Sequence, residues 1–94
     1  MEKVPVVEID QRINNLQSVL AAQELDGAFL MQNVDIFYFS GTIQTSVLFV
    51  PREGLPILMV QKGYARAKAE SSLENVVPIK GRKEIRRVLG DFGI

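Results

Sequence analysis

Residues 45–60, TSVLFVPREGLPILMV, contain two apolar runs that are separated by a short turn. The runs at 45–50 and 56–60 have the length and composition of β-strands. Between them, Pro51 fixes its own φ angle and Gly54 tolerates a positive φ angle, which together favour a tight turn. The stretch therefore predicts an antiparallel hairpin with a loop of about four or five residues.

Segments with helical and strand-like patterns alternate on both sides of this hairpin. Apolar residues recur at three- and four-residue steps over residues 8–24 and 82–92, and helix-forming residues dominate 64–72, so all these segments predict helices. Short apolar runs predict strands at 27–31, which is expected to be buried on both faces, and at 75–79. Strands that alternate with helices, plus one hairpin, predict an α/β fold with a mixed β-sheet and flanking helices.

A short aromatic segment, NVDIFYFSG, occupies residues 33–41 between the first strand and the hairpin. It predicts a short helix, in which Asn33 is expected to cap the start and Gly41 to end the last turn. Its three consecutive aromatic rings cannot all point inward. Either two rings pack in the core with Tyr38 at the edge, or one ring lines a cleft or a subunit contact, where aromatic residues are enriched. The sequence leaves both possibilities open.

The composition limits what kind of protein this is. The chain has 94 residues, enough for one small domain, and a formal net charge of zero, which gives no overall attraction to nucleic acid or anionic lipid. Cysteine is absent, which fits a reducing, cytoplasmic location. Histidine is also absent, which argues against a complete enzyme, because His is the commonest general base. The charged start is unlike a signal peptide, and no apolar run approaches the roughly 20 residues of a membrane span.

Few residues are candidates for chemistry. The carboxylates of Asp26, Asp35, Glu53 and Glu70 fall in different elements, so we expect them at the surface and in caps. The basic residues of 80–87 favour the solvated face of an amphipathic helix over a nucleic-acid contact, since no stacking aromatic residues are interleaved with them. The GTIQTS segment after the aromatic helix offers hydroxyl and amide groups only. It has neither the spacing of a phosphate-binding loop nor a metal-binding motif.

Four segments taken together resemble the N-terminal domain of the creatinase/prolidase/aminopeptidase P family: RINNLQSVLAAQELDGAFL, QNVDIFYFSG, SVLFVPREGLPILMV and RAKAES. In that family a helix runs into a strand through a leucine-aspartate step, here at residues 25–26. A turn of the pattern N-x-x-Y-x-[ST]-G follows, and Tyr38, Ser40 and Gly41 match its second half. The resemblance implies one creatinase/prolidase-like domain over residues 1–94, incomplete at its C-terminal end and lacking the last strands of the sheet.

Departures from the family pattern bear on both structure and chemistry. Asp35 replaces the Asn that begins the turn motif, and Asp can cap a helix as Asn does. Glu24 stands where the family often has Gly at a helix end; a left-handed Glu costs about 1 kcal/mol, so we expect the local turn to differ. The family's catalytic centre, two Asp, one His and two Glu around two metal ions, lies in a C-terminal pita-bread domain. That domain is absent from this sequence, so no catalytic residue carries over.

The resemblance also implies a role for the domain. The parent protein would be an Xaa-Pro dipeptidase or aminopeptidase, a homodimer that hydrolyses short proline-containing peptides with two divalent metal ions (Mn, Co or Zn). Family N-terminal domains pack against the catalytic domain, help to form the dimer and restrict access to the active site. The residues implied for a substrate rim or a subunit contact are Tyr38, Thr42, Gln44, Thr45 and Ser46. No metal ligand or cofactor is expected in this chain itself.

Other interpretations remain open from the sequence. The chain could be a binding or scaffold module of a family member without peptidase activity, or part of a creatinase-like amidinohydrolase. A free-standing nucleic-acid-binding domain would rest on the basic residues 80–87. The residues encoded downstream distinguish a peptidase parent, because it needs the five metal ligands there.

Overall fold

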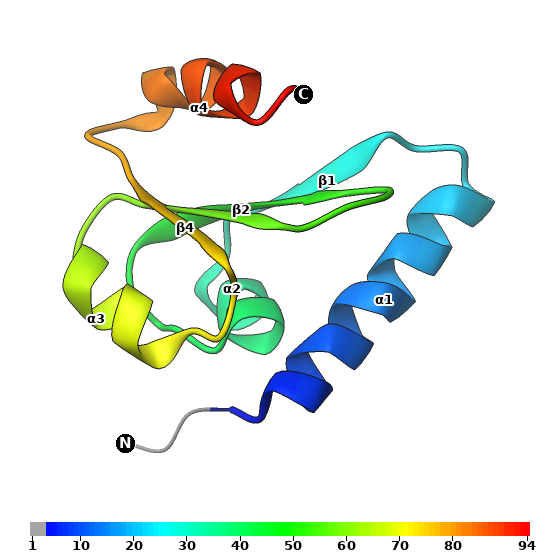
Figure 1. Ribbon diagram of the computed structural model, residues 1–94, viewed down its shortest axis with the longest axis horizontal. Helices are drawn as coiled ribbons and strands as arrows, with labels where there is room; N and C mark the ends of the chain where they lie inside the picture. Colours follow the sequence, from blue (N-terminus) through cyan, green and yellow to red (C-terminus); the bar gives the residue numbers. More distant parts are fainter. Residues whose placement is uncertain (1–3) are drawn as a thin grey trace.

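Helices and strands alternate along the chain in the order that the sequence predicts (Figure 1). The structure, a computed structural model, describes residues 4–94. Its elements are α1 (Val6–Ala22), β1 (Gly27–Leu30), α2 (Asn33–Ser40), β2 (Ser46–Pro51), β3 (Ile57–Val60), α3 (Tyr64–Glu70), β4 (Asn75–Pro78), the 3₁₀-helix η1 (Arg82–Glu84) and α4 (Ile85–Asp91). The helix expected over 82–92 therefore begins as a 3₁₀ turn.

The four strands of the described chain form one mixed sheet in the order β1-β2-β3-β4. β1 pairs antiparallel with β2, and β2 antiparallel with β3, so that Leu48 stands opposite both Leu30 and Leu58. β4 lies parallel to β3, and α3 forms the crossover between them. The predicted hairpin and the predicted mixed sheet are confirmed. Pro51, expected in the turn, is instead the last residue of β2, and Gly54 turns the chain with a φ of 103°.

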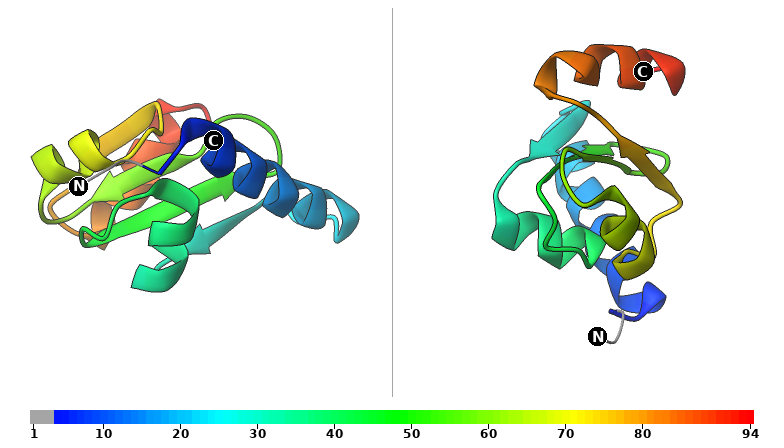
Figure 2. Two further views of the ribbon diagram at one scale, coloured as in Figure 1. Left: turned by 90° about the horizontal axis from the view of Figure 1, so that it is seen from below. Right: turned by 90° about the vertical axis from the view of Figure 1, so that its left-hand side faces the viewer.

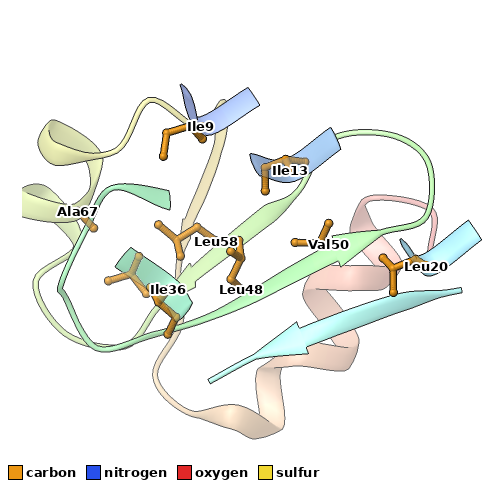
Figure 3. Packing of buried hydrophobic residues seen from close by; sticks show 9 residues of the cluster. Ile9, Ile13, Leu20, Ile36, Leu48, Val50, Leu58 and Ala67 are labelled. Carbon is orange, nitrogen blue, oxygen red and sulfur yellow. The ribbon is translucent and has the colours of Figure 1, made fainter. Parts of the chain in front are cut away.

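Helices cover both faces of the sheet: α1, α2 and α3 lie on one face and α4 on the other (Figures 1 and 2). Successive residues of a strand point to opposite faces, so the continuous apolar runs of β2 and β3 supply both cores. The first core, shown in Figure 3, contains Ile9, Ile13, Leu20, Ile36, Leu48, Val50, Leu58, Val60 and Ala67. The second core, beneath α4, contains Val47, Phe49, Ile57, Met59, Ile79 and Val88.

Polar contacts hold the hairpin against α1 and against the start of β1. The side-chain amide of Gln17, on α1, donates to the backbone oxygens of Pro51 and Gly54, each over 2.9 Å. Arg52 donates to a carboxylate oxygen of Asp26 over 3.0 Å at the surface. The carboxylate of Asp26 therefore lies at the surface, as the sequence predicts, and pairs with the hairpin through Arg52.

β1 lies at an edge of the sheet, so the expectation that it is buried on both faces is wrong. Within the described chain β1 pairs with β2 alone. The side chain of Phe29 is 47% exposed, although its ring lies 4.9 Å from that of Phe49 between centroids. The core beneath α4 includes no residue of β1. An apolar run of this length does not distinguish an edge strand from a central one, because both need at least one buried face.

α2 differs from the prediction at its start and agrees with it at its end. Gln32 occupies the N-cap position, Asn33 is the first helical residue, and no side chain caps the helix. The expectation that Asn33 caps it is therefore wrong. Gly41 ends the helix in a left-handed conformation, with a φ of 84°, as the sequence predicts.

Glu24 is left-handed, with a φ of 57°, at the end of α1. The Leu25 N–H donates to the Leu20 oxygen over 2.9 Å, and the Glu24 N–H donates to the Ala21 oxygen over 3.1 Å. These are the two bonds of a Schellman motif. The expectation of a different turn is wrong: the left-handed helix end forms with Glu in place of Gly, and the strain stays at this residue.

Replacing Glu24 with glycine should therefore stabilise the domain. Glu24→Gly removes a strain of about 1–2 kcal/mol and adds some unfolded-state entropy, so we expect the free energy of unfolding to rise by about 0.5–1 kcal/mol. Urea unfolding followed by circular dichroism measures this. Glu74→Gly, at an exposed residue whose φ is not positive, is the control and should lose up to about 1 kcal/mol. A loss of stability in Glu24→Gly would contradict the prediction.

Candidate functional site

The GTIQTS loop, residues 41–46, links α2 to β2 and is attached to α3. Thr42 is fully buried, and its hydroxyl donates to Oε1 of Glu70, the last residue of α3, over 2.6 Å. The same hydroxyl accepts the backbone N–H of Gln44 over 3.2 Å, and the Gln44 side-chain amide donates to Glu70 over 3.4 Å. One carboxylate thus fixes the loop from a position 28 residues further along the chain.

Further contacts hold the second half of the loop. The Ser46 hydroxyl donates to the Gln44 backbone oxygen over 2.9 Å, and the Gln61 N–H donates to the Thr45 backbone oxygen over 2.8 Å. The Gln44 side chain lies directly against Gly63, where a Cβ atom would collide with its amide oxygen. Gly63 also has a φ of 78°, so a side chain there would be strained as well as crowded.

The five predicted site residues therefore fall into two groups. Thr42, Gln44 and Ser46 use their side chains in hydrogen bonds within the domain. Thr45 and Tyr38 are exposed, so both are available to a partner. The internal hydrogen bonds give the first group a clear part in shaping the loop, and contact with a substrate or a subunit remains a prediction for all five.

Tyr38 is exposed but held in place by α1. The Arg12 guanidinium carbon lies 4.3 Å from the centre of the Tyr38 ring, a cation–π contact, and Arg12 donates to the Tyr38 backbone oxygen over 2.9 Å. The ring also meets that of Phe39 edge-on, with 4.9 Å between centroids. Of the three consecutive rings, that of Phe39 packs partly against the core, while those of Phe37 and Tyr38 are exposed. The interpretation in which two of these rings pack in the core and only Tyr38 lies at the edge is therefore wrong.

α2 carries an exposed apolar surface that the sequence patterns did not predict. It consists of Val34, Phe37 and Tyr38, and we call it the α2 patch. Val34 is 80% exposed, and its side chain shares a helix face with the other two because they follow at three and four residues. Ile43, in the loop that follows, is also exposed. The spacing 34, 37, 38 was the available signal, although a core-facing helix shows the same spacing.

The loop contacts change the ionisation of Glu70. The hydrogen bond from Thr42 lowers the pKa of this carboxyl group below its ordinary value of 4.5. Burial has a smaller effect and raises the pKa. The amide of Gln44 and the charge of Arg66 lower it further. A carboxylate that accepts hydrogen bonds is favoured over its protonated form.

This shift predicts a pH dependence of stability. Because the pKa of Glu70 is lower in the folded state, its contribution is complete above the unfolded pKa of 4.5 and is lost as the pH falls through the folded pKa. We expect Glu70→Gln to lose less stability than the native chain between about pH 7 and about pH 3. Urea unfolding at the two pH values measures the difference. The control is Glu74→Gln, which removes an exposed carboxyl group. Equal losses of stability in the native chain and in Glu70→Gln would refute the prediction.

The described residues do not fit a metal site. Over residues 4–94, no three acidic, His or Cys side chains gather where they could hold an ion. Two of the candidate carboxylates serve other contacts: Asp26 pairs with Arg52, and Glu70 accepts a hydrogen bond from Thr42. No helix within these residues is both long and apolar enough to cross a membrane.

The fold and this surface define an α/β domain with a shaped, partly aromatic exposed face. The sequence matches the family Creatinase/Prolidase N-terminal domain over residues 12–94. The chain belongs to this family, and the resemblance noted in its sequence is confirmed. No curated protein matches the chain significantly.

Solved structures agree with this assignment. The prolidase from Pyrococcus furiosus is 30% identical with a TM-score of 0.71, over 83% of this chain and 25% of the prolidase. An Xaa-Pro aminopeptidase from Streptococcus pyogenes shares the fold at 14% identity, with a TM-score of 0.78 over 95% of this chain and 70% of that one. Aminopeptidase P from Streptococcus thermophilus does so at 15% identity, with a TM-score of 0.71 over 89% and 68%. The chain thus spans about a quarter of the prolidase that it matches.

Proposed function

We propose that this chain is the non-catalytic N-terminal domain of a longer cytoplasmic Xaa-Pro dipeptidase or aminopeptidase. In this role it packs against its own catalytic domain, contributes to a homodimer and restricts access to the active site. Membership of the creatinase/prolidase family and the 30% identity with a prolidase support the proposal. The two divalent metal ions (Mn, Co or Zn) and the residues that bind them would belong to the catalytic domain, since the described residues offer no such site.

The exposed α2 patch is the observation on which the docking role rests. Phe37 and Tyr38 present aromatic surface to solvent, and aromatic residues are enriched in protein interfaces. Tyr38 is already ordered by Arg12, at 4.3 Å from its ring, so less side-chain entropy is lost when a partner covers it. An apolar surface that is held in place in advance suits a permanent contact between domains or subunits.

The GTIQTS loop supports the access-limiting role. Its exposed side chains, Ile43 and Thr45, alternate with Thr42 and Gln44, which are bonded to Glu70. A rim that limits the length of a peptide must keep its shape when a longer peptide presses on it. The hydrogen bonds to Glu70 provide that resistance, and short proline-containing peptides are the substrates from which the parent would exclude longer ones.

The docking role can be tested in the full-length parent with a charge in the α2 patch. Phe37→Asp should weaken the dimer or the docking of the domains at least about tenfold, because a buried unpaired carboxylate would replace an apolar contact. Analytical ultracentrifugation and the ratio of kcat/KM for Xaa-Pro dipeptides and for longer peptides measure the two effects. Val19→Asp, at an exposed residue of α1 outside the patch, is the control. An unchanged assembly and an unchanged ratio in Phe37→Asp would refute the docking role.

The identity of the parent has a separate test. We expect it to hydrolyse Xaa-Pro dipeptides when Mn²⁺ or Co²⁺ is supplied, and this chain alone to show no turnover under the same conditions. Hydrolysis of creatine in place of dipeptides, or no hydrolysis at all, would favour an amidinohydrolase or a scaffold module. Turnover by the chain alone would overturn its non-catalytic role.

A further inference from the structure

An open groove lies where α1 meets the hairpin turn and the link from α3 to β4. Its walls come from three segments that are far apart in the sequence: α1 between residues 10 and 17, the turn at 54–56 and the link at 72–74. The groove has a volume of about 410 Å³, which lies within the range of pockets that bind small ligands or single side chains. It includes no residue of the α2 patch or of the GTIQTS loop, so it is separate from the surfaces that the proposed function uses.

Hydrogen bonds within the domain hold the walls of this groove in place. The side-chain amide of Gln17 donates to the backbone oxygens of Pro51 and Gly54, each over 2.9 Å, and so fixes α1 against the turn. These two bonds account for both of its N–H groups, and the amide oxygen remains an acceptor. In the link, the Leu73 N–H donates to the hydroxyl of the buried Ser71 over 3.1 Å. A groove that is shaped in advance loses little conformational entropy when a ligand enters it.

Part of the groove is apolar. Ile13 points from α1 towards the sheet and is buried (Figure 3), and Pro56 is buried as well. Leu73 packs partly against the first core, whereas Leu55 is exposed. These side chains suit the hydrocarbon portion of a ligand, and the polar groups around them decide which ligand is recognised.

The charged side chains in the walls are both acidic. They are Asp10 on α1 and Glu74 in the link, both exposed, and within residues 4–94 neither forms an ion pair. Glu8, also on α1, is by contrast paired with Arg12 at 3.5 Å. Three further side chains with hydrogen-bond acceptors line the groove: Asn14, Gln17 and Ser72. The groove therefore complements a cation that carries several hydrogen-bond donors and an apolar stem.

We propose that this groove binds an arginine side chain from a basic peptide segment of a partner protein. A guanidinium group presents five N–H donors in a planar fork, against three on a lysine ammonium, so it can bond to acceptors on more than one wall. The stem of the arginine would lie along Leu55 and Leu73 while its charged head reaches the carboxylates. One exposed ion pair contributes little to binding, so recognition depends on both carboxylates together with the apolar contact.

Titration of this chain with a short peptide, followed by NMR at low salt, tests the proposal. N-acetyl-leucyl-arginine amide should shift the amides of Asn14, Leu55 and Leu73 in a saturable manner, with a dissociation constant of about 1 mM or lower. Citrulline in place of arginine keeps the shape and removes the charge, so it should bind at least about tenfold more weakly. Raising the salt concentration to about 0.5 M should weaken the arginine peptide several-fold, because exposed charges are screened.

Three results of this titration would overturn the proposal. The first is the absence of saturable shifts at the groove up to about 10 mM peptide. The second is equal binding of the citrulline peptide, since the charge would then play no part. The third is binding of free arginine as tight as that of the peptide, which would assign the groove to an amino acid instead of a peptide segment.

Variants of the two carboxylates make the test specific to the groove. Asp10→Asn and Glu74→Gln should each weaken binding of the arginine peptide at least about threefold, and the double variant at least about tenfold. Both residues are exposed, so we expect the variants to fold, which unchanged circular dichroism spectra would verify. Asp35→Asn, at an exposed residue of α2 outside the groove, is the control and should bind as the native chain does. Native-like binding by the double variant, or equal weakening by Asp35→Asn, would contradict recognition at this groove.

Discussion

Leu58→Ala is expected to lower the free energy of unfolding by about 2–5 kcal/mol, the largest effect of any substitution considered for this domain. Leu58 is fully buried on the inner strand β3 and packs in one core with Leu48 and Ile36 (Figure 3). A sheet with helices on both faces has little freedom to collapse around the missing atoms. The loss would then contain both the transfer of the side chain and the cost of a cavity.

For a domain of 94 residues, this loss is a large part of the total stability, which is about 5–14 kcal/mol at typical values per residue. Urea unfolding followed by circular dichroism gives the difference directly. Leu55→Ala removes the same atoms from a side chain that is 55% exposed, so it should cost less than about 0.5 kcal/mol. Equal losses in the two variants would mean that the core is not packed as described.

Thr42→Val is expected to cost about 1–3 kcal/mol, the second-largest effect. The substitution keeps the shape of the side chain but removes a hydroxyl that donates to Glu70 over 2.6 Å and accepts the Gln44 N–H over 3.2 Å. Because Thr42 is fully buried, water cannot replace the hydroxyl without cost. The same substitution should raise the pKa of Glu70, since the bond from Thr42 is the main cause of its lowering.

Two comparisons separate the hydrogen bond from simple loss of volume. Thr42→Ser keeps the hydroxyl and loses one methyl group, so its pH dependence of stability should stay close to that of the native chain. Thr45→Val changes the same atoms at an exposed residue and should stay within about 0.5 kcal/mol. If Thr42→Val behaves like Thr45→Val, the Thr42 hydroxyl does not hold the loop. In the full-length parent, a loosened loop should also reduce the discrimination between short and long peptides.

Much of the fold could be predicted from local patterns. The hairpin was specified by two apolar runs around Gly54, the helices α1 and α4 by apolar residues at three- and four-residue steps, and α3 by helix-forming residues. These signals are local, so a single sequence carries them. The order of the strands in the sheet is not a local property. β1 and the inner strands have similar apolar runs, and only the assembled sheet shows that β1 is an edge strand and that Phe29 is exposed.

The candidate site was harder to predict than the fold. The polar character of the GTIQTS loop was visible in the sequence, but Glu70, to which it is tied, is 28 residues from Thr42 and was placed among the surface carboxylates. Similarly, the contact of Arg12 with Tyr38 joins residues 26 apart. Such pairs depend on how α1 and α3 lie on the sheet, and no periodicity within one element encodes that.

The sequence by itself determined a hairpin of two buried strands at residues 45–60, a mixed α/β sheet around it and the family to which the chain belongs. Those conclusions rest on side-chain periodicity and turn chemistry, which act over a few residues. Only the tertiary structure decided which strand is the open edge, which aromatic rings face solvent, and that Glu70 fixes the loop leading into the hairpin. These features arise from packing between distant elements, where burial and hydrogen bonding depend on the complete arrangement of the chain.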